Sequence, residues 1–195
     1  MMKTLRNFFN VKPNNEKGIE GIQEINEQYV DKEKAGNSYI VGFANGKGKI
    51  CHWGLLIDLA GESHDNSAIG ILIHMWVEDS KLSLFYNKNQ FYRNRFELFE
   101  SVGKIYDISG KNNPKDWYHE LKEPITQWFE EFKKNSGENW SSQCNSHAFS
   151  LYLCSKLNLQ YPDSCKQLEK ESEPLLDSKK LYNTLAHLID KQKNI

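Results

Sequence analysis

We predict that the fold is organised around the stretch WSSQCNSHAFSLYLCSKL, residues 140–157, in which a polar run turns into an apolar one. Ser141 and Ser142 are residue types that cap helix N-termini, so the pattern predicts a helix from Gln143 onward. The inward face of this helix would hold Cys144, Ala148, Leu151 and Tyr152, at offsets of four, seven and eight. We therefore expect the thiol of Cys144 to point into the protein.

A cysteine in the first turn of a helix is a candidate nucleophile. The helix dipole and the unpaired backbone N–H groups stabilise a thiolate there, so we expect the pKa of Cys144 to lie below its ordinary value. A buried cysteine is otherwise an inert packing residue, and this is our interpretation of Cys154 and Cys165. A nucleophilic role for Cys144 requires a base elsewhere in the chain.

Length and composition indicate one globular domain. The 195 residues are 38% hydrophobic and 12% aromatic, enough to bury one sizeable core. We predict a single domain over residues 1–195 with a catalytic-like core at about 38–160. Amphipathic spacing predicts helical extensions at 18–35 and 179–191.

Charge and cysteine usage exclude several classes of protein. With 25 Lys and Arg against 26 Asp and Glu, no global field attracts nucleic acid. The longest apolar run, residues 68–73, is too short to span a bilayer, and the amino terminus lacks the apolar segment of a secretory signal. Four cysteines without paired spacing indicate reduced thiols, hence a cytoplasmic or otherwise reducing location. No cofactor is predicted.

The middle of the chain is predicted to be a mostly antiparallel sheet followed by helices. An Asn45-Gly46 turn signal separates the first two predicted strands. The predicted strands are 38–43, 49–59, 68–77, 83–86 and 96–108. Aromatic and basic residues at 85–95 fit either a nucleic-acid- or lipid-facing patch or a solvated loop between strands. A helix follows at 121–132, with Pro124 in its first turn and Gly137 closing it. This order predicts an α+β fold with the Cys144 helix lying against the sheet.

Two predicted neighbouring strands each carry one inward histidine. Alternation in the first strand puts His52 on one face with Gly54, whose missing side chain would leave room for a substrate or for the helix. In the next strand, His74 faces the same way. A thiol at a helix start with two strand histidines is the minimum set for a thiol hydrolase. Cys144 would be the nucleophile, His52 the base and His74 the orienter of the base.

Three segments carry a resemblance to a known superfamily: HWGLLID at 52–58, ILIH at 71–74 and QCNSHAFS at 143–150. Together they resemble the circularly permuted branch of the NlpC-type, papain-like cysteine hydrolases, in which the histidine strand precedes the cysteine helix. The histidine segments are similar to the lecithin:retinol acyltransferase-like proteins, and the cysteine segment is similar to the PPPDE peptidases. Gln143 replaces the Asn usual before the cysteine, and two extra residues separate Cys144 from Phe149. The resemblance covers residues 38–160 and implies a permuted papain-like core.

Our leading hypothesis is a cysteine hydrolase that cleaves an amide, isopeptide or (thio)ester bond through a covalent acyl-enzyme. The Cys144 backbone N–H, with Gln143 as a second donor, would form the oxyanion hole. Peptides or protein conjugates are the favoured substrates, with acyl lipids second. The alternative is a non-catalytic peptide- or lipid-binding module on the same fold. A zinc site built from Cys144, His147, His52 and His74 is disfavoured, because their spacing is unlike that of zinc motifs.

Overall fold

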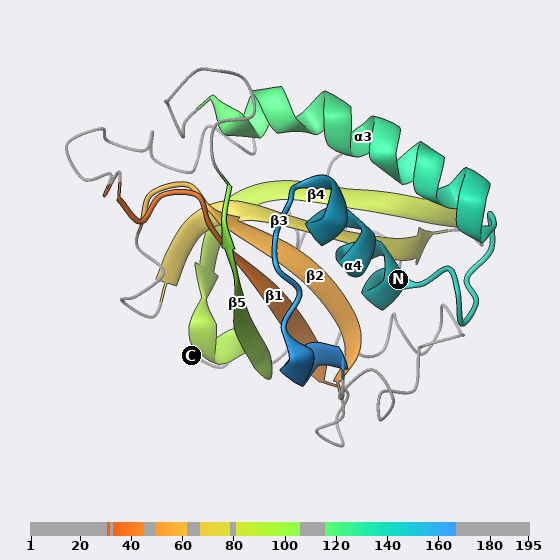
Figure 1. Cartoon of the computed structure of the whole chain (residues 1–195), viewed down its shortest axis with the longest axis horizontal. Helices are drawn as coiled ribbons and strands as arrows, with labels where there is room; N and C mark the ends of the chain where they lie inside the picture. Colours follow the sequence, from red (N-terminus) through yellow and green to blue (C-terminus); the bar gives the residue numbers. More distant parts are fainter. Residues whose placement is uncertain are drawn as a thin grey trace, which may run out of the picture.

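The computed structural model describes residue 31 and residues 33–44, 50–61, 67–78, 81–105 and 116–166. Five strands form one sheet in the order β4-β3-β2-β1-β5, and every neighbouring pair is antiparallel (Figure 1). The strands are β1 (Asn37–Ala44), β2 (Ile50–Asp58), β3 (Ser67–Glu78), β4 (Lys81–Tyr92) and β5 (Leu98–Lys104). The helices α3 (Trp117–Ser136) and α4 (Ser146–Lys156) follow, and residues 163–166 are also helical. The predicted α+β class is confirmed.

Strand β4 is much longer than predicted. It pairs with β3 over the full length of both strands, from Glu78 opposite Lys81 to Ser67 opposite Tyr92. The sequence hides this because 87–90 reads NKNQ, which has low strand propensity. Those polar residues are held in the ladder by the branched residues of β3 opposite them, so the loop predicted at 85–95 is wrong. Only a short 3-10 helix, Arg93–Arg95, interrupts the chain before β5.

The two faces of the sheet bury different cores. Figure 1 shows α4 crossing β2 and β3 while α3 runs along β4, and both helices contribute to the first core. The first core includes from the sheet Ile40, Trp53, Leu55, Ile57, Ile71, Ile73 and Met75. The second core lies on the opposite face and holds Tyr39, Val41, Leu56, Ala68, Leu72 and Phe85. Within the described residues no helix contributes to the second core.

Helix α3 begins at Trp117, four residues before the predicted start. Pro124 therefore lies inside the helix and not in its first turn. Its ring nitrogen carries no hydrogen for the helical ladder. Gly137 ends the helix as predicted, with a positive φ of 108° that favours glycine. Neither described helix is both long and apolar enough to cross a membrane.

Helix α4 begins later than predicted, at Ser146. Asn145 is the N-cap, because its side chain accepts a hydrogen bond from the Ala148 N–H at 2.9 Å. Cys144 consequently precedes the helix and does not lie in its first turn. The buried face is also different from the predicted one: it holds Ser146, His147, Phe149, Ser150, Leu153 and Cys154. The later start shifts the helical register, so that Leu151 is 40% exposed.

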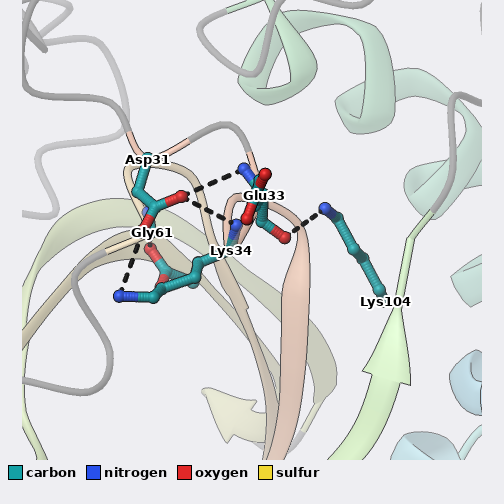
Figure 2. A network of polar contacts seen from close by, with 6 residues as sticks. Asp31, Glu33, Lys34, Gly61 and Lys104 are labelled. Atoms are coloured by element: carbon teal, nitrogen blue, oxygen red, sulfur yellow. Dashed lines mark hydrogen bonds and ion pairs between the residues drawn. The ribbon is translucent and has the colours of Figure 1, made fainter.

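The predicted N-terminal helix is wrong at its carboxyl end, where residues 33–36 form a turn; its residues 18–30 lie outside the described chain, as does the predicted helix at 179–191. Figure 2 shows how this turn is held. The Asp31 carboxylate accepts hydrogen bonds from the backbone N–H groups of Glu33 and Lys34. The Lys104 ammonium, at the end of β5, donates to the Glu33 carbonyl at 2.6 Å. The turn is thereby tied to the sheet edge.

The packing of α4 can be tested with two leucines on one helix. Leu153 is fully buried and Leu151 is exposed, so Leu153→Ala should lower the free energy of unfolding by about 2–5 kcal/mol. The Leu151→Ala control should change it by less than about 0.5 kcal/mol. Urea unfolding followed by circular dichroism measures both. Equal losses in the two variants would contradict this register of α4.

Candidate active site

The structure brings together two of the three predicted site residues, His52 on β2 and His74 on β3. The Nε2 atom of His52 lies 2.9 Å from the Nδ1 atom of His74, a hydrogen bond between two buried rings. Alternation along both strands explains the meeting, because each histidine projects from the face that also carries Leu56 and Leu72. The predicted histidine pair on neighbouring strands is therefore present, but it lies on the face of the sheet opposite α4 and Cys144, so the expectation that both histidines face the cysteine helix is wrong.

Aromatic rings enclose the two histidines. Phe85 stacks on His74 with ring centroids 4.3 Å apart, and Phe43 lies 5.7 Å from His52. Burial in these apolar surroundings lowers the pKa of His74 to about 3 and the pKa of His52 well below its ordinary value, with the neighbouring His74 adding to the effect on His52. Both rings are therefore neutral at pH 7.

The second ring nitrogen of His52 is the unusual atom of the site. Nδ1 is buried and has no hydrogen-bond partner within the described part of the chain. Buried polar atoms in proteins are almost always paired, and those left unpaired in a native fold often have a chemical role. His74 thus satisfies Nε2 of His52, whereas Nδ1 of His52 has no partner among the described residues.

The sheet opens next to this histidine. The ladder between β2 and β3 joins Leu55 to Ile73 and continues to Asp58, with no pairing of β3 to the earlier residues of β2. The Trp53 N–H instead donates to the Ser146 Oγ atom at 3.1 Å. The first residue of α4 therefore replaces the missing ladder bond and fixes the helix start at the point where the two strands separate.

Cys144, the predicted nucleophile, is fully buried in the first core with Trp53. Its thiol donates to the Gly137 carbonyl, with a sulfur–oxygen distance of 3.0 Å, and makes no hydrogen bond to either histidine. Burial raises the pKa of Cys144, an effect that the nearby Lys133 ammonium partly offsets. The predicted lowering of this pKa is wrong, because the thiol lies before the helix and not in its first turn.

Two hydrogen bonds join Ser141 and Cys144 in the loop between α3 and α4. The Ser141 N–H donates to the Cys144 carbonyl at 2.9 Å, and the Cys144 N–H donates back to the Ser141 Oγ atom at 3.0 Å. The backbone donor predicted for an oxyanion hole is therefore already occupied. Gln143, the second predicted donor, is exposed. Sequence reasoning placed these groups at a helix start, where their N–H bonds would have been unpaired.

Trp140 contacts both the first core and the His52 ring. It packs against the first core, which contains Cys144, and its ring stacks on His52 at an interplanar angle of 17° with centroids 6.4 Å apart. Its indole Nε1 atom is buried and has no partner among the described residues. Trp140 is thus the aromatic neighbour of His52 that comes from the thiol loop.

The structure also bears on Gly54, on His147 and on a metal site. Space beside Gly54 is not open, because an added Cβ atom would lie 3.1 Å from Leu72 and 3.4 Å from the Cβ of His74. His147 contacts Tyr161 and packs on Trp53, on the side of the sheet opposite His52. In the described chain no group of three or more His, Cys, Asp or Glu side chains is arranged to hold a metal ion.

Sequence reasoning did not single out Trp140 and Ser146 as site residues. Trp140 is the only aromatic residue between Gly137 and His147, and an apolar ring in a polar loop was the available signal. Ser146 was hidden by the preceding serines, which are equally good caps by residue type. Its contact with Trp53 depends on where the ladder between β2 and β3 ends, which is a tertiary feature.

Comparison of the chain with models of protein families, with curated proteins and with solved structures found no match.

The buried histidine pair predicts a pH dependence of stability. An unfolded histidine titrates near pH 6.5 while folded His74 titrates near 3, so the unfolded state binds more protons between these values. The free energy of unfolding should therefore fall as pH falls through this window, by up to about 1.4 kcal/mol per pH unit for each histidine. His74→Gln should flatten the slope measured by urea unfolding at pH 4–7.

A matched control for the stability experiment is the exposed His119 on α3. His119→Gln should leave the pH slope unchanged, because this ring is exposed and takes no part in the buried pair. A wild-type stability that stays constant from pH 7 to pH 4.5 would contradict the burial of neutral imidazoles.

Proposed function

We propose that this protein is a cysteine hydrolase in which Cys144 is the nucleophile, His52 the general base and His74 the residue that orients the base. The observation that carries the proposal is the state of the His52 ring. Its Nε2 lies 2.9 Å from Nδ1 of His74, its Nδ1 is buried with no partner among the described residues, and its ring stacks on Trp140 of the loop that carries Cys144. A base held at one nitrogen and available at the other is the arrangement of hydrolase triads.

The chemistry needs one tautomer of the pair. With the His52 proton on Nε2, that N–H donates to Nδ1 of His74, and the lone pair of His52 Nδ1 can accept the thiol proton. The Cys144 sulfur then attacks a carbonyl carbon, and the carbonyl electron pair moves to oxygen. Collapse of this intermediate expels the amine, alcohol or thiol, which takes the proton back from Nδ1. Water releases the acyl group by the same steps and restores the thiol.

The Cys144 thiol donates to the Gly137 carbonyl in the first core, whereas His52 projects from the opposite face of the sheet. The proposed reaction therefore needs a movement of the loop at 137–145 that carries the thiol past the end of the β2–β3 ladder to His52. The pKa directions define the type of catalysis: with the pKa of Cys144 raised and that of His52 lowered, the neutral thiol and neutral imidazole are favoured over a preformed ion pair. Proton transfer then accompanies the attack on the carbonyl and does not precede it.

The resemblance to permuted papain-like hydrolases supports the same assignment. It placed the histidine strand before the cysteine segment, and the chain has β2, β3 and α4 in that order with His52, His74 and Cys144 on or beside them. We propose a permuted papain-like core for residues 38–160 on this basis. Substrates of the class would be peptides, protein conjugates or acyl lipids, all of which present a carbonyl carbon to the thiol.

A second candidate function is a non-catalytic binding module on the same fold. The observation that favours it is the thiol itself, which is fully buried, hydrogen-bonded to a backbone carbonyl and raised in pKa. Inert cysteines share these features. The two candidates differ in whether Cys144 forms a covalent adduct with an acyl donor.

Alkylation of Cys144 by iodoacetamide should become faster with rising pH, with a midpoint higher than that of an ordinary cysteine, because burial raises the pKa of this thiol. Lys133→Gln should move the midpoint higher, since the ammonium stabilises the thiolate. Peptide mapping by mass spectrometry assigns the modified cysteine. A plateau reached below pH 8 would show a preformed ion pair and contradict the general-base mechanism.

The roles of the two histidines can be separated by substitution. His52→Ala should abolish acylation of Cys144 by an activated ester, because it removes the proposed base. His74→Ala should leave a reduced, measurable rate, since an orienting residue acts only through the base. Rates should be compared at equal folded fraction, with His119→Ala as the surface control. A fully active His52→Ala variant would overturn the assignment of the base.

A further inference from the structure

The sheet is divided next to the histidine pair. Strand β3 pairs with β4 over twelve residues, but it pairs with β2 over only four, and this shorter ladder ends at Ile73. Ser146 accepts the Trp53 N–H that would otherwise continue the ladder. We call the stretches that do not pair with each other, residues 50–53 of β2 and 75–78 of β3, the split.

The inner edge of β3 in the split carries backbone groups that no described strand pairs with. Backbone N–H and C=O groups point alternately to the two sides of a strand. The Leu59 N–H donates to the Ile69 carbonyl, so the odd-numbered residues of β3 direct these groups toward β2. Met75 and Val77 therefore direct theirs into the split, where the ladder with β2 is missing. A strand edge of this kind can accept a further strand.

The split lies between the histidine pair and the protein surface. Ile50 and Val77, at its outer end, are half-buried, whereas Met75, at its inner end, is fully buried. His74 directly precedes Met75, and its ring is hydrogen-bonded both to His52 and to the Met75 backbone. A chain that lies along this edge of β3 would therefore end beside the proposed base.

The backbone groups of the split select one chemical class of ligand. Met75 and Val77 lie two residues apart, about 6.6 Å along the strand, which is the repeat at which an extended peptide presents N–H and C=O groups on one side. An acyl chain has no groups that pair with them. The edge therefore favours peptides and protein conjugates over acyl lipids, which the proposed reaction alone does not distinguish.

We propose that the substrate is a peptide segment that binds in an extended conformation along the inner edge of β3, as an added strand in the split. The inference rests on the proposed function, because it assigns a substrate class to the same site. Main-chain groups of the peptide pair with those of Met75 and Val77, in the place where β2 no longer pairs with β3. In this mode of recognition the main-chain hydrogen bonds supply the affinity.

Two p-nitrophenyl esters test for the added strand. One is the ester of acetyl-Val-Ala-Val-Gly, and the other is the ester of acetylglycine, which has the same reacting carbonyl and lacks the peptide. The Cys144 sulfur bonds to that carbonyl carbon and p-nitrophenolate leaves, so the burst of p-nitrophenolate that Cys144→Ser abolishes measures acylation. The peptide ester should acylate Cys144 at least about 10-fold faster, because it forms several main-chain hydrogen bonds. p-Nitrophenyl octanoate should show no such advantage over p-nitrophenyl acetate.

Two N-methylated peptide esters separate strand pairing from general apolar binding. One analogue carries methyl groups on the nitrogens of both valines, and the other carries them on those of the alanine and the glycine. Only one of these two alternating sets of N–H groups can face β3. One analogue should therefore lose most of the rate advantage, while the other should keep it within about twofold. Equal losses in the two analogues would overturn the added strand.

Val77→Pro tests the edge from the side of the protein. It removes an N–H that faces the split and takes no part in the ladder with β4. Acylation by the peptide ester should slow by about fivefold, and acylation by the acetylglycine ester should stay unchanged, at equal folded fraction. The matched control is Lys88→Pro, because the Lys88 N–H points away from β3 at the outer edge of the sheet. This control should change neither rate.

The outcomes also separate this inference from the proposed function. If wild-type protein shows a burst that depends on Cys144, but the peptide ester has no advantage or the octanoate ester has the larger one, the hydrolase stands and the peptide strand is overturned. If no burst depends on Cys144, both are overturned. A peptide advantage that one N-methylated analogue and Val77→Pro reduce supports both.

Discussion

The hydrogen bond from the Trp53 N–H to the Ser146 hydroxyl is the constraint on which the candidate site depends. It joins the start of α4 to β2 where β2 and β3 stop pairing, so a helix residue completes a strand's hydrogen bonding. A backbone N–H left unpaired at that buried point would be costly. The bond therefore fixes the thiol loop, which immediately precedes Ser146, beside the open end of the sheet. Trp140 meets His52 through this placement.

Burial governs the chemistry of the site in two opposing directions. Apolar surroundings on one face of the sheet keep His52 and His74 neutral, and those on the other face keep Cys144 protonated. A thiol at a helix start would have a lowered pKa, which was the prediction from sequence. The observed burial favours the neutral form of all three groups instead.

Period-two alternation was sufficient to predict the histidine pair, because His52 and His74 lie in strands rich in branched residues, where face assignment is unambiguous. The α4 boundary was not predictable in the same way. All the candidate caps are of residue types that cap helices: Ser141, Ser142, Asn145 and Ser146. Only the hydrogen bond that the Ala148 N–H donates to the Asn145 side chain identifies Asn145 as the N-cap. The length of β4 was missed because its polar residues gain their strand conformation from β3. Local propensity carries no information on such pairing.

The error in the helix boundary has a chemical consequence. Moving the N-cap from position 142 to 145 takes the Cys144 N–H out of the unpaired helix start and gives it to the Ser141 hydroxyl. A helix start supplies both a lowered thiol pKa and a ready oxyanion donor, so a shift of three residues removes both together. Cys144 then has neither the unpaired N–H groups nor the positive end of the helix beside its sulfur, so burial alone decides the state of the thiol, and its pKa is raised where the sequence predicted it to be lowered.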